Sequence, residues 1–555
     1  MKRRPSRAGT GSWLAASGLL SLLVLAPLAA LVFAAFRGSG DLWQHLIAFV
    51  LPVAIRDTLV LLAGVGLLAV TIGTCTAWLV TAYDFAGRRI IDWALLLPIA
   101  VPTYIIAYAY LDILHPVGPV QTALRALLGI DSPRDLRLPD IRSMTGCIAL
   151  LGFVLYPYVY LTTRAMFVMQ SANLIDVSRT LGTSRSGVFF RVALPLARPA
   201  IVLGLTLALL EALNDIGASE FLGVRTLTVA IYSTWVTRSD LPGAAQIALA
   251  MLAMVLLLVA LERRARERRQ YANDAQNPRP LEPHRLSGWK SAAALATCLI
   301  PIGIGFVIPA VYLIDESLRR IRFAGISTAI VSETVNTIAI SLLATALTVG
   351  AGVVVAYTMR IDGGAVPAAL SRLASLGYAV PGTVLAIGLL PIVSGVEMAV
   401  DAGTRRFLGF PSGLFLLGTG AAIVYAYLVR FLAIASGGIE AGFSRVSPSL
   451  DDAARTLGET VVGRLRRVHL PLLRPAMATT ALHVFVDCMK ELPATLLLRP
   501  LGFETLATHL YGEAVRGTYE EAAIAALMIV AAGLVPVLLL ARISRSDPFG
   551  GALGR

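Results

Sequence analysis

Long apolar runs alternate with short polar segments along the whole chain of 555 residues. A helix needs about 20 mostly apolar residues to cross a bilayer. Only helices satisfy all of their backbone groups within single spans of this length. The pattern therefore predicts an all-α polytopic membrane protein with about twelve transmembrane helices, at roughly 13–36, 57–83, 91–113, 144–168, 199–222, 241–262, 291–314, 333–358, 373–394, 416–436, 475–497 and 521–541.

One polar segment between the apolar runs is written twice. The stretch DVSRTLGTSRSGVFFRVALPLARPA begins at Asp176, and DAARTLGETVVGRLRRVHLPLLRPA begins at Asp452. The two stretches are identical at 14 of 25 positions, at an offset of 276 residues. Shorter matches at an offset of 279 pair AVPTYIIA at Ala100 with AVPGTVLA at Ala379. A repeat of this size indicates two structurally similar halves.

The duplication also predicts how the chain is divided. We expect a first half of six helices at 1–262, a basic cytoplasmic linker at 263–290, and a second half of six helices at 291–555. An even number of spans gives both halves the same orientation, so they are predicted to be parallel repeats related by a pseudo-two-fold axis along the membrane normal.

Composition and charge support this interpretation and exclude others. The chain is 57% hydrophobic and 15% charged, with a net charge of +13. The predicted cytoplasmic segments hold 29 of the 47 Lys and Arg residues, as the positive-inside rule requires if both termini are cytoplasmic. The cations are spread over loops, so we expect membrane lipid and no nucleic acid as a partner. The four cysteines form no CxxC pair, which argues against a disulfide framework or a zinc site.

The repeated segment predicts a short helix, a glycine turn and a second helix that enters the following span. Glycine relaxes the backbone at such a turn, and proline is tolerated in the first turn of the next helix. One interpretation is an amphipathic helix that lies on the lipid surface. Two copies at matched positions favour the other interpretation, a docking helix for a partner with two-fold symmetry.

The spacing of both copies resembles the EAA loop of ABC importer permeases of type I. In that pattern a triplet and three further residues precede a glycine. Nine residues separate the glycine from an aliphatic residue, and one residue separates that from a Leu-Pro pair. The first copy has Val177-Ser178 in place of the two alanines, and both copies begin with Asp in place of Glu. The matching residues are Asp176, Gly182, Val192, Leu194 and Pro195 in the first copy, and Asp452, Ala453, Ala454, Gly458, Val468, Leu470 and Pro471 in the second.

The resemblance implies that the two loops dock on two copies of an ATP-binding subunit. The chain has three lysines and none follows a glycine, so it lacks the Gly-Lys pair of a phosphate-binding loop. We therefore expect the chain to be a transport subunit and not an enzyme, with no cofactor of its own. ATP and Mg would be used by the partner subunits.

Acidic side chains lie in the fifth apolar run of each half. Glu211 matches Asp487 and Asp215 matches Glu491 at the offset of 276. The i,i+4 spacing within each pair predicts that both acids share one helical face. Acids within a membrane are costly and usually face a cavity or a partner, so we predict that these four and Lys490 flank a translocation pathway.

Two alternatives to this hypothesis stay open. The acids could form structural ion pairs, with Lys490 neutralising one of them and Arg499 or Arg225 holding others. They could also contact a metal cargo directly, because carboxylates suit a highly charged cation, but the sequence leaves the identity of any metal ligand unknown.

Further stretches narrow the resemblance to the fused, twelve-span permeases of ferric iron ABC importers. The stretches are MKELPATLLLRPLGFETLATHLY from Met489 and SLGYAVPGTVLAIGLL from Ser375. The resemblance implies a bacterial inner-membrane protein and a periplasmic binding protein that delivers the ion. Related permeases carry thiamine, phosphonate or polyamine, so those solutes remain alternatives. A secondary transporter is a further rival, and a membrane enzyme finds no support because the six histidines are scattered. We expect His469 to lie at the partner interface.

Overall fold

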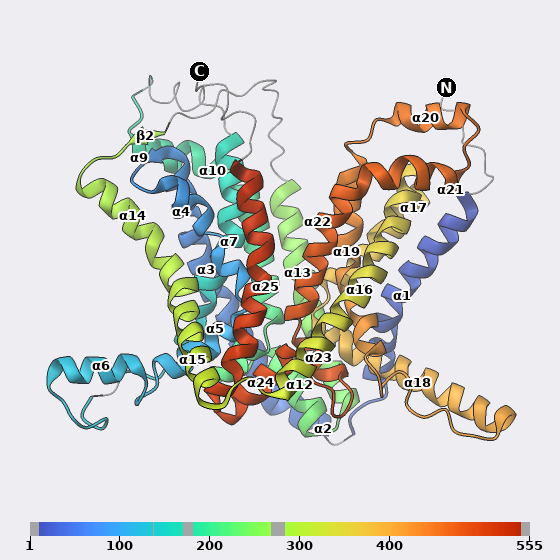
Figure 1. Ribbon diagram of the computed structural model, residues 1–555, viewed down its shortest axis with the longest axis horizontal. Helices are drawn as coiled ribbons and strands as arrows, with labels where there is room; N and C mark the ends of the chain where they lie inside the picture. Colours follow the sequence, from blue (N-terminus) through green and yellow to red (C-terminus); the bar gives the residue numbers. More distant parts are fainter. Residues whose placement is uncertain are drawn as a thin grey trace. The chain divides into compact units, whose positions relative to one another are not determined.

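The protein is described by a computed structural model that covers residues 10–40, 42–136, 138–169, 180, 182–267 and 283–545. The chain forms two compact units (Figure 1). The described residues of unit 1 lie within Met1–Ile47, Ala230–Leu252 and Ile326–His509, and those of unit 2 lie within Ala48–Val229, Ala253–Gly325 and Leu510–Arg555.

Unit 1 is built on long helices joined by short turns. Its elements are α1 (Thr10–Phe36), α2 (Leu42–His45), the π-helical turn η4 (Ser233–Thr237), α16 (Thr328–Ile361), α17 (Ala365–Ala374), the 3-10 helix η6 (Ser375–Ala379), α18 (Gly382–Leu408), α19 (Ala421–Phe443), α20 (Pro448–Thr456), α21 (Val461–Arg464), the π-helical turn η7 (Leu465–His469), α22 (Leu470–Lys490) and α23 (Pro493–Leu498).

Unit 2 has the same kind of construction. Its elements are α3 (Leu51–Ala82), β1 (Tyr83–Asp84), α4 (Arg88–Ala94), the 3-10 helix η2 (Leu97–Ala100), α5 (Thr103–Ile113), α6 (Pro119–Leu128), α7 (Met144–Met169), α9 (Arg185–Val188), the π-helical turn η3 (Phe189–Ala193), α10 (Leu194–Asn214), α11 (Gly217–Phe221), β2 (His284–Arg285), α14 (Trp289–Ile302), the π-helical turn η5 (Gly303–Val307), α15 (Ile308–Ala324) and α25 (Tyr519–Arg545). Four elements contribute to both units: η1 (Leu46–Val50), α12 (Leu227–Tyr232), α13 (Leu241–Glu267) and α24 (Leu506–Arg516).

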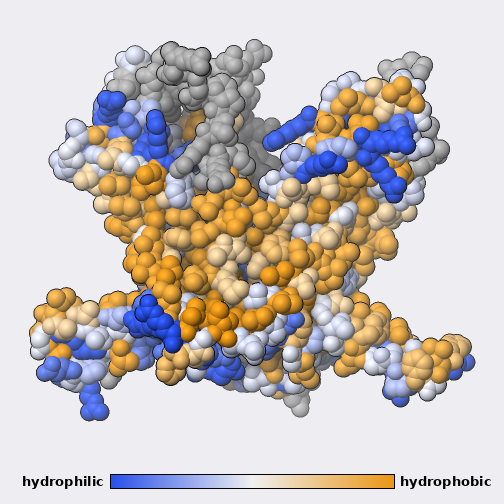
Figure 2. Space-filling model, viewed as in Figure 1, coloured by the Kyte–Doolittle hydropathy of each residue, from blue (hydrophilic) through white to orange (hydrophobic). Residues whose placement is uncertain are grey.

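The predicted all-α fold is confirmed by this architecture. Among the described residues, the strands are limited to β1 and β2, which pair in parallel with Tyr83 opposite His284 and Asp84 opposite Arg285. This short pairing attaches the described end of the predicted linker to the end of α3. Figure 2 shows apolar side chains over the long helices and hydrophilic side chains gathered toward their ends, as expected of helices that face lipid.

The described part of the chain accounts for ten or eleven of the about twelve expected spans. Ten helices in the described part of the chain are long and apolar enough to cross a membrane, or eleven if a bent pair is counted as one span. The bent pair replaces the predicted span at 91–113, because the chain turns by 91° between Arg88–Ala100 and Thr103–Ile113. The predicted span at 475–497 is divided into α22 and α23, and α22 carries Arg474, Asp487 and Lys490.

The predicted halves and the compact units are divided differently. Helix α1 belongs to the first half of the sequence, yet it packs within unit 1, where the Ser17 hydroxyl donates to the Thr358 hydroxyl of α16 at 2.8 Å. Helices α14 and α15 belong to the second half and lie in unit 2, where Tyr312 donates to Asp112 at 2.7 Å. The boundary at 262–291 remains a prediction about the repeats, and the units exchange the first helix of each repeat.

Each unit contains the same close helix crossing. In unit 2 a Cβ atom placed on Gly73 of α3 would lie 2.8 Å from the Cβ of Val159 on α7. In unit 1 a Cβ atom on Gly352 of α16 would lie 2.8 Å from the Cβ of Ala435 on α19. These glycines are equivalent in the repeat and allow the backbones to approach, as small residues do between membrane helices.

Substitution of Gly352 by leucine is expected to destabilise unit 1 by about 1–3 kcal/mol, the usual cost of overpacking a close contact. Gly350 lies on the exposed side of the same helix, where a Cβ atom would have no neighbour within 4 Å. Gly350→Leu is therefore the matched control. Thermal unfolding in detergent should separate the two variants, and equal melting temperatures would contradict the crossing as a source of stability.

Candidate functional site

The second repeated loop folds as its sequence predicts. Helix α20 ends in a glycine turn at Gly458, whose φ is +80°, and α21 follows and leads through η7 into α22. The Ser447 hydroxyl accepts from the Ser449 amide at 3.3 Å, and the Thr460 hydroxyl accepts from the Gly463 amide at 3.0 Å. Both helix starts are thus capped by residues of the type that favours this position. Pro471 lies in the first turn of α22, where proline is tolerated.

One side of this loop is exposed and mixes charged with apolar groups. Asp452 and Ala453 are exposed, whereas Ala454 is buried against the unit. Leu457 is 83% exposed and Val462 is 46% exposed. Val468 and Leu470 are half-buried, and Pro471 is exposed. Exposed apolar side chains grouped on one face of a loop are typical of a docking surface for a partner protein.

The other side of the loop is attached to unit 1 by a buried charge cluster. Asp451 accepts from Nε of Arg360 at 3.0 Å, and Nη2 of Arg360 lies 2.9 Å from the same carboxylate oxygen. Its other carboxylate oxygen lies 3.6 Å from Nη1 of Arg464 and 2.9 Å from Nε2 of His469. Burial lowers the pKa of His469, Asp451 opposes the shift, and Arg360 and Arg464 add to it. His469 therefore lies beside two guanidinium groups and one carboxylate.

Two expectations about this loop need correction. The expectation that His469 lies at the partner interface is wrong, because its side chain is 0% exposed. Asp451 was missed, since the match to the family pattern falls on the next residue, Asp452. The adjacent acids were the available signal: in a helix they point about 100° apart, so only one of them can face the bundle.

In the described part of the first repeated loop, aromatic side chains contact unit 2. Asp176 lies outside the described residues. Gly182 has a φ of +82°, as Gly458 does. The Phe189 ring lies 5.2 Å from Trp78 of α3, and Trp78 lies 5.2 Å from Phe167 of α7. Val192 in η3 and Leu194 and Pro195, which begin α10, are half-buried.

The acids in the fifth apolar run mark breaks in both helices. Helix α10 ends at Asn214 and α22 ends at Lys490, so Asp215 and Glu491 lie beyond the helices with extended backbone. The prediction that the acids of each pair share one helical face is therefore wrong. Apolar residues follow both breaks in the sequence. The hydrophobic pattern therefore gives no sign of the break at Asp215.

Asp215 and Glu491 cap the short helices that follow. An oxygen of Asp215 accepts from the Ala218 amide at 3.0 Å, and an oxygen of Glu491 accepts from the Ala494 amide at 3.0 Å. Both side chains are buried. A carboxylate near exposed helix amides is favoured by the helix dipole. These acids hold the two broken spans in shape.

Each capping acid also approaches the start of a second helix. Asp215 lies beside the side chain of Thr103, the first residue of α5. Glu491 lies beside Gly382, the first residue of α18, where a Cβ atom would lie 2.6 Å from the carboxylate. Thr103 and Gly382 are equivalent in the repeat, directly after the shared AVP sequence. The buried Arg430 side chain lies 3.7 Å from Glu491.

The other two acids lie on the helices before the breaks and are half-buried. Asp487 and Lys490 form an ion pair of 2.9 Å, with side chains 20% and 25% exposed. This pair agrees with the alternative in which Lys490 neutralises one of the acids. Arg499 instead pairs with Glu504, and Arg430 was not recognised as the partner of Glu491.

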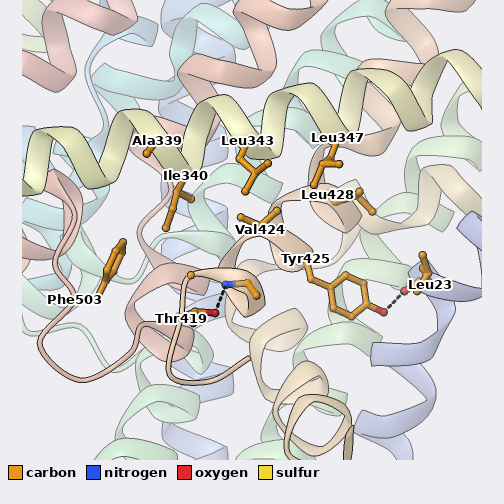
Figure 3. Close-up of a pocket in the computed structure, with 12 residues that line it drawn as sticks. Leu23, Ala339, Ile340, Leu343, Leu347, Thr419, Val424, Tyr425, Leu428 and Phe503 are labelled. Atoms are coloured by element: carbon orange, nitrogen blue, oxygen red, sulfur yellow. Dashed lines mark hydrogen bonds between the residues drawn. The ribbon is translucent and has the colours of Figure 1, made fainter. Parts of the chain in front are cut away.

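An apolar groove of about 630 Å³ lies in unit 1 (Figure 3). Leu343 of α16 and Val424 of α19 point into it, and the Tyr425 hydroxyl donates to the Leu23 carbonyl of α1 at 2.8 Å. The Thr419 hydroxyl is used by the local backbone. This lining offers no charge to an ionic solute. Within the described ranges, no group of three or more His, Cys, Asp or Glu side chains could hold a metal ion.

Known proteins give a consistent family assignment. The family model described as "Binding-protein-dependent transport system inner membrane component" matches residues 69–270 and again 348–546. The Fe(3+)-transport system permease protein FbpB 2 of Haemophilus influenzae is 24% identical over 88% of this chain and 89% of its own length. The probable ABC transporter permease protein y4fN of Sinorhizobium fredii is 23% identical over 95% of this chain and 94% of its own length.

A shorter relative matches one half alone. The molybdenum transport system permease protein ModB of Escherichia coli is 29% identical over 36% of this chain and 89% of its own length. The two matched ranges of the family model begin 279 residues apart, at the same offset as the repeat in the sequence. The chain therefore belongs to the family of inner membrane components of binding-protein-dependent transport systems, as an ABC importer permease with two family domains fused in one polypeptide.

Proposed function

We propose that this permease imports ferric iron, delivered by a binding protein on the outer side of a bacterial inner membrane. The observation that carries the proposal is the match to the Fe(3+) permease along almost the full length of both chains. The molybdenum relative matches only 36% of this chain, a length close to one of its two family domains. The fused organisation is thus shared with the iron permease.

The charges in the fifth spans also fit a cation. Glu211 and Asp487 are half-buried acids in helices that would cross the membrane. We propose that these two acids flank the solute pathway. Lys490, in its ion pair with Asp487, would partly neutralise the Asp487 carboxylate. Hard oxygen ligands suit Fe³⁺, and carboxylates would repel an oxyanion such as molybdate. Asp215 and Glu491 stabilise the helix breaks close to this region.

The repeated loops supply the connection to ATP. We propose that two ATP-binding subunits dock on the exposed faces of the loops, one on each, from the cytoplasmic side. Both termini of the chain would also lie on that side. Closure of the ATP-binding subunits would move both loops and switch the halves between inward-open and outward-open states, as in other two-repeat transporters. A secondary transporter would have no use for two such loops.

Uptake in reconstituted vesicles tests the proposed function. The chain is co-expressed with candidate ATP-binding subunits, purified as a complex and supplied with the binding protein and radiolabelled Fe³⁺. We expect uptake that requires ATP, the ATP-binding subunits and the binding protein together. Radiolabelled molybdate and sulfate serve as matched solutes. Uptake of an oxyanion in place of iron would overturn the cargo, and uptake driven by an ion gradient without ATP would overturn the ABC mechanism.

A further inference from the structure

The second repeated loop, which we call the second coupling loop, has an ionic attachment to unit 1 that the corresponding residues of the first loop cannot provide. In the second loop, the Asp451 carboxylate contacts three basic side chains: Arg360 from α16, Arg464 from α21 and His469 from η7. Arg464 and His469 are buried, and the side chains of Arg360 and Asp451 are 17% and 16% exposed. One carboxylate thus joins α20, the two elements that follow the glycine turn and a long helix of the bundle.

The same arrangement extends into the backbone. Arg360 also donates from Nη2 to the Val446 carbonyl at 2.9 Å, directly before α20. The Tyr357 hydroxyl, one turn earlier on α16, donates to the Val461 carbonyl at 2.6 Å. Both sides of the glycine turn are therefore hydrogen-bonded to the same end of α16. Fork-shaped arginine contacts fix orientation as well as distance.

The sequence of the first half cannot build this cluster. At the offsets of the repeat, Arg360 corresponds to Thr81, Asp451 to Ile175, Arg464 to Val188 and His469 to Ala193. None of these four residues is ionisable. Thr81 is buried and donates to its own helix at 2.7 Å, and Val188 and Ala193 are buried among apolar groups.

The two loops share an aromatic pair of bundle residues beneath them, which we call the aromatic platform. Trp78 and Phe167 correspond to Tyr357 and Phe443, and both pairs are in ring contact. In the first loop Phe189 packs on this platform, while in the second His469 and the apolar Leu465 do so. The ionic contacts are thus added to a common apolar base. An apolar contact is less directional than an ion pair with several hydrogen bonds.

We propose that Asp451 is a positioning residue that locks the second coupling loop to α16, and that the two loops of this permease are mechanically unequal. The proposal rests on the proposed function of the loops as docking sites for ATP-binding subunits. The second loop would transmit the movement of its ATP-binding subunit directly to α16. The first loop lacks the corresponding ionisable side chains, so it would transmit the movement without this lock.

The lock is first tested on the wild-type chain by hydrogen exchange in lipid nanodiscs. We expect the backbone amides of residues 448–469 to exchange more slowly than those of residues 172–193. Asp451→Asn keeps the shape of the side chain and removes the charge, and it should accelerate exchange in 448–469 alone. Equal exchange of the two loops in the wild type would overturn the proposal. This measurement does not depend on transport or on ATP.

The functional consequence is tested in the complete complex with the ATP-binding subunits and the binding protein. We expect Asp451→Asn to lower the number of solute ions moved per ATP hydrolysed by about five-fold or more, the lower range of typical coupling between sites. ATP-binding subunits should still be retained, and Asp451→Glu should restore most of the coupling. Loss of the subunits together with coupling would indicate a merely structural role.

Two further variants complete the design. Asp84→Asn makes the same chemical change at an exposed ion pair with Arg285, 3.9 Å long, and should leave coupling unchanged. The quadruple variant R360T/D451I/R464V/H469A gives the second loop the residues of the first and leaves no buried charge unpaired. Normal coupling and normal exchange in this variant would refute the lock. If wild-type complexes show no ATP-driven transport, the proposed function fails while the exchange experiment still decides on the lock.

Discussion

Replacing Gly458 by valine is expected to abolish most ATP-driven transport while the protein stays folded in the membrane. Gly458 has a φ of +80°, and no atom lies within 4 Å of the position that a Cβ would occupy. A substitution therefore meets no steric neighbour and acts through the backbone alone. The left-handed conformation costs an L-residue about 1–2 kcal/mol, and β-branched residues are among the least tolerant of it.

The substitution would destabilise the turn between α20 and α21, and this turn positions the exposed faces of the loop. A change of about 1.4 kcal/mol corresponds to a factor of ten in an equilibrium, so we expect transport to fall by about ten-fold or more. ATP hydrolysis should continue, because it takes place on the partner subunits. The measurement is uptake per ATP hydrolysed in reconstituted vesicles.

Asparagine supplies the matched control for this experiment. Asn visits the left-handed region more readily than other non-glycine residues, so Gly458→Asn should retain most of the coupling. Gly182 has the same backbone conformation, with a φ of +82°, and the same pair of substitutions there should behave alike. If valine and asparagine had equal effects at Gly458, the backbone explanation would be wrong.

Removing Glu491 is expected to destabilise the protein more than removing any other acid in the fifth spans. The Glu491 side chain is 5% exposed, and its partner Arg430 is 10% exposed. Glu491→Ala would leave a buried guanidinium without its carboxylate and the Ala494 amide without its acceptor. Breaking one side of a buried ion pair typically costs about 3–5 kcal/mol. Thermal unfolding in detergent and the amount of protein in the membrane measure this loss.

Asp487 should respond in the opposite way. Its ion pair with Lys490 is partly exposed, and such pairs contribute little to stability, about 0–1 kcal/mol. Asp487→Asn is therefore expected to fold normally and to reduce solute transport, if Asp487 flanks the pathway. Glu491→Gln, which keeps an oxygen for the Ala494 amide, should lie between wild type and Glu491→Ala in stability. A large loss of stability in Asp487→Asn with normal transport per folded molecule would reverse the two roles.

The two predictions assign different roles to the repeated features. The glycine turns and loop faces would act in the movement, and the capping acids would support the broken helices. The glycine turns and the exposed loop faces would act on the partner subunits, where the energy of ATP enters. The capping acids Asp215 and Glu491 hold broken helices next to the starts of α5 and α18. A broken helix exposes backbone groups that lipid cannot satisfy. The buried carboxylates satisfy some of those groups, so this region can bend without losing its hydrogen bonds.

The sequence by itself determined the features that repeat or that depend on local chemistry. The apolar runs established an all-α membrane protein, and the offset of 276–279 residues established the duplication. The spacing around Gly182 and Gly458 identified the loops, because the φ that a turn requires is a local property and glycine meets it. Pro471 in the first turn of α22 was predictable for the same reason.

The tertiary structure decided which residues the predicted helices and acidic groups contact. Apolar periodicity shows that a helix face avoids water, and it does not distinguish lipid from another helix. The exchange of α1 and α14 between the units therefore could not be predicted. The choice of Asp451 over Asp452 depended on where Arg360 lies, 91 residues earlier in the chain. The helix break at Asp215 lies within the run at 199–222 that predicts one continuous span, and the distant helix start at Thr103 lies beside it. Contacts between residues far apart in the sequence fixed each of these features.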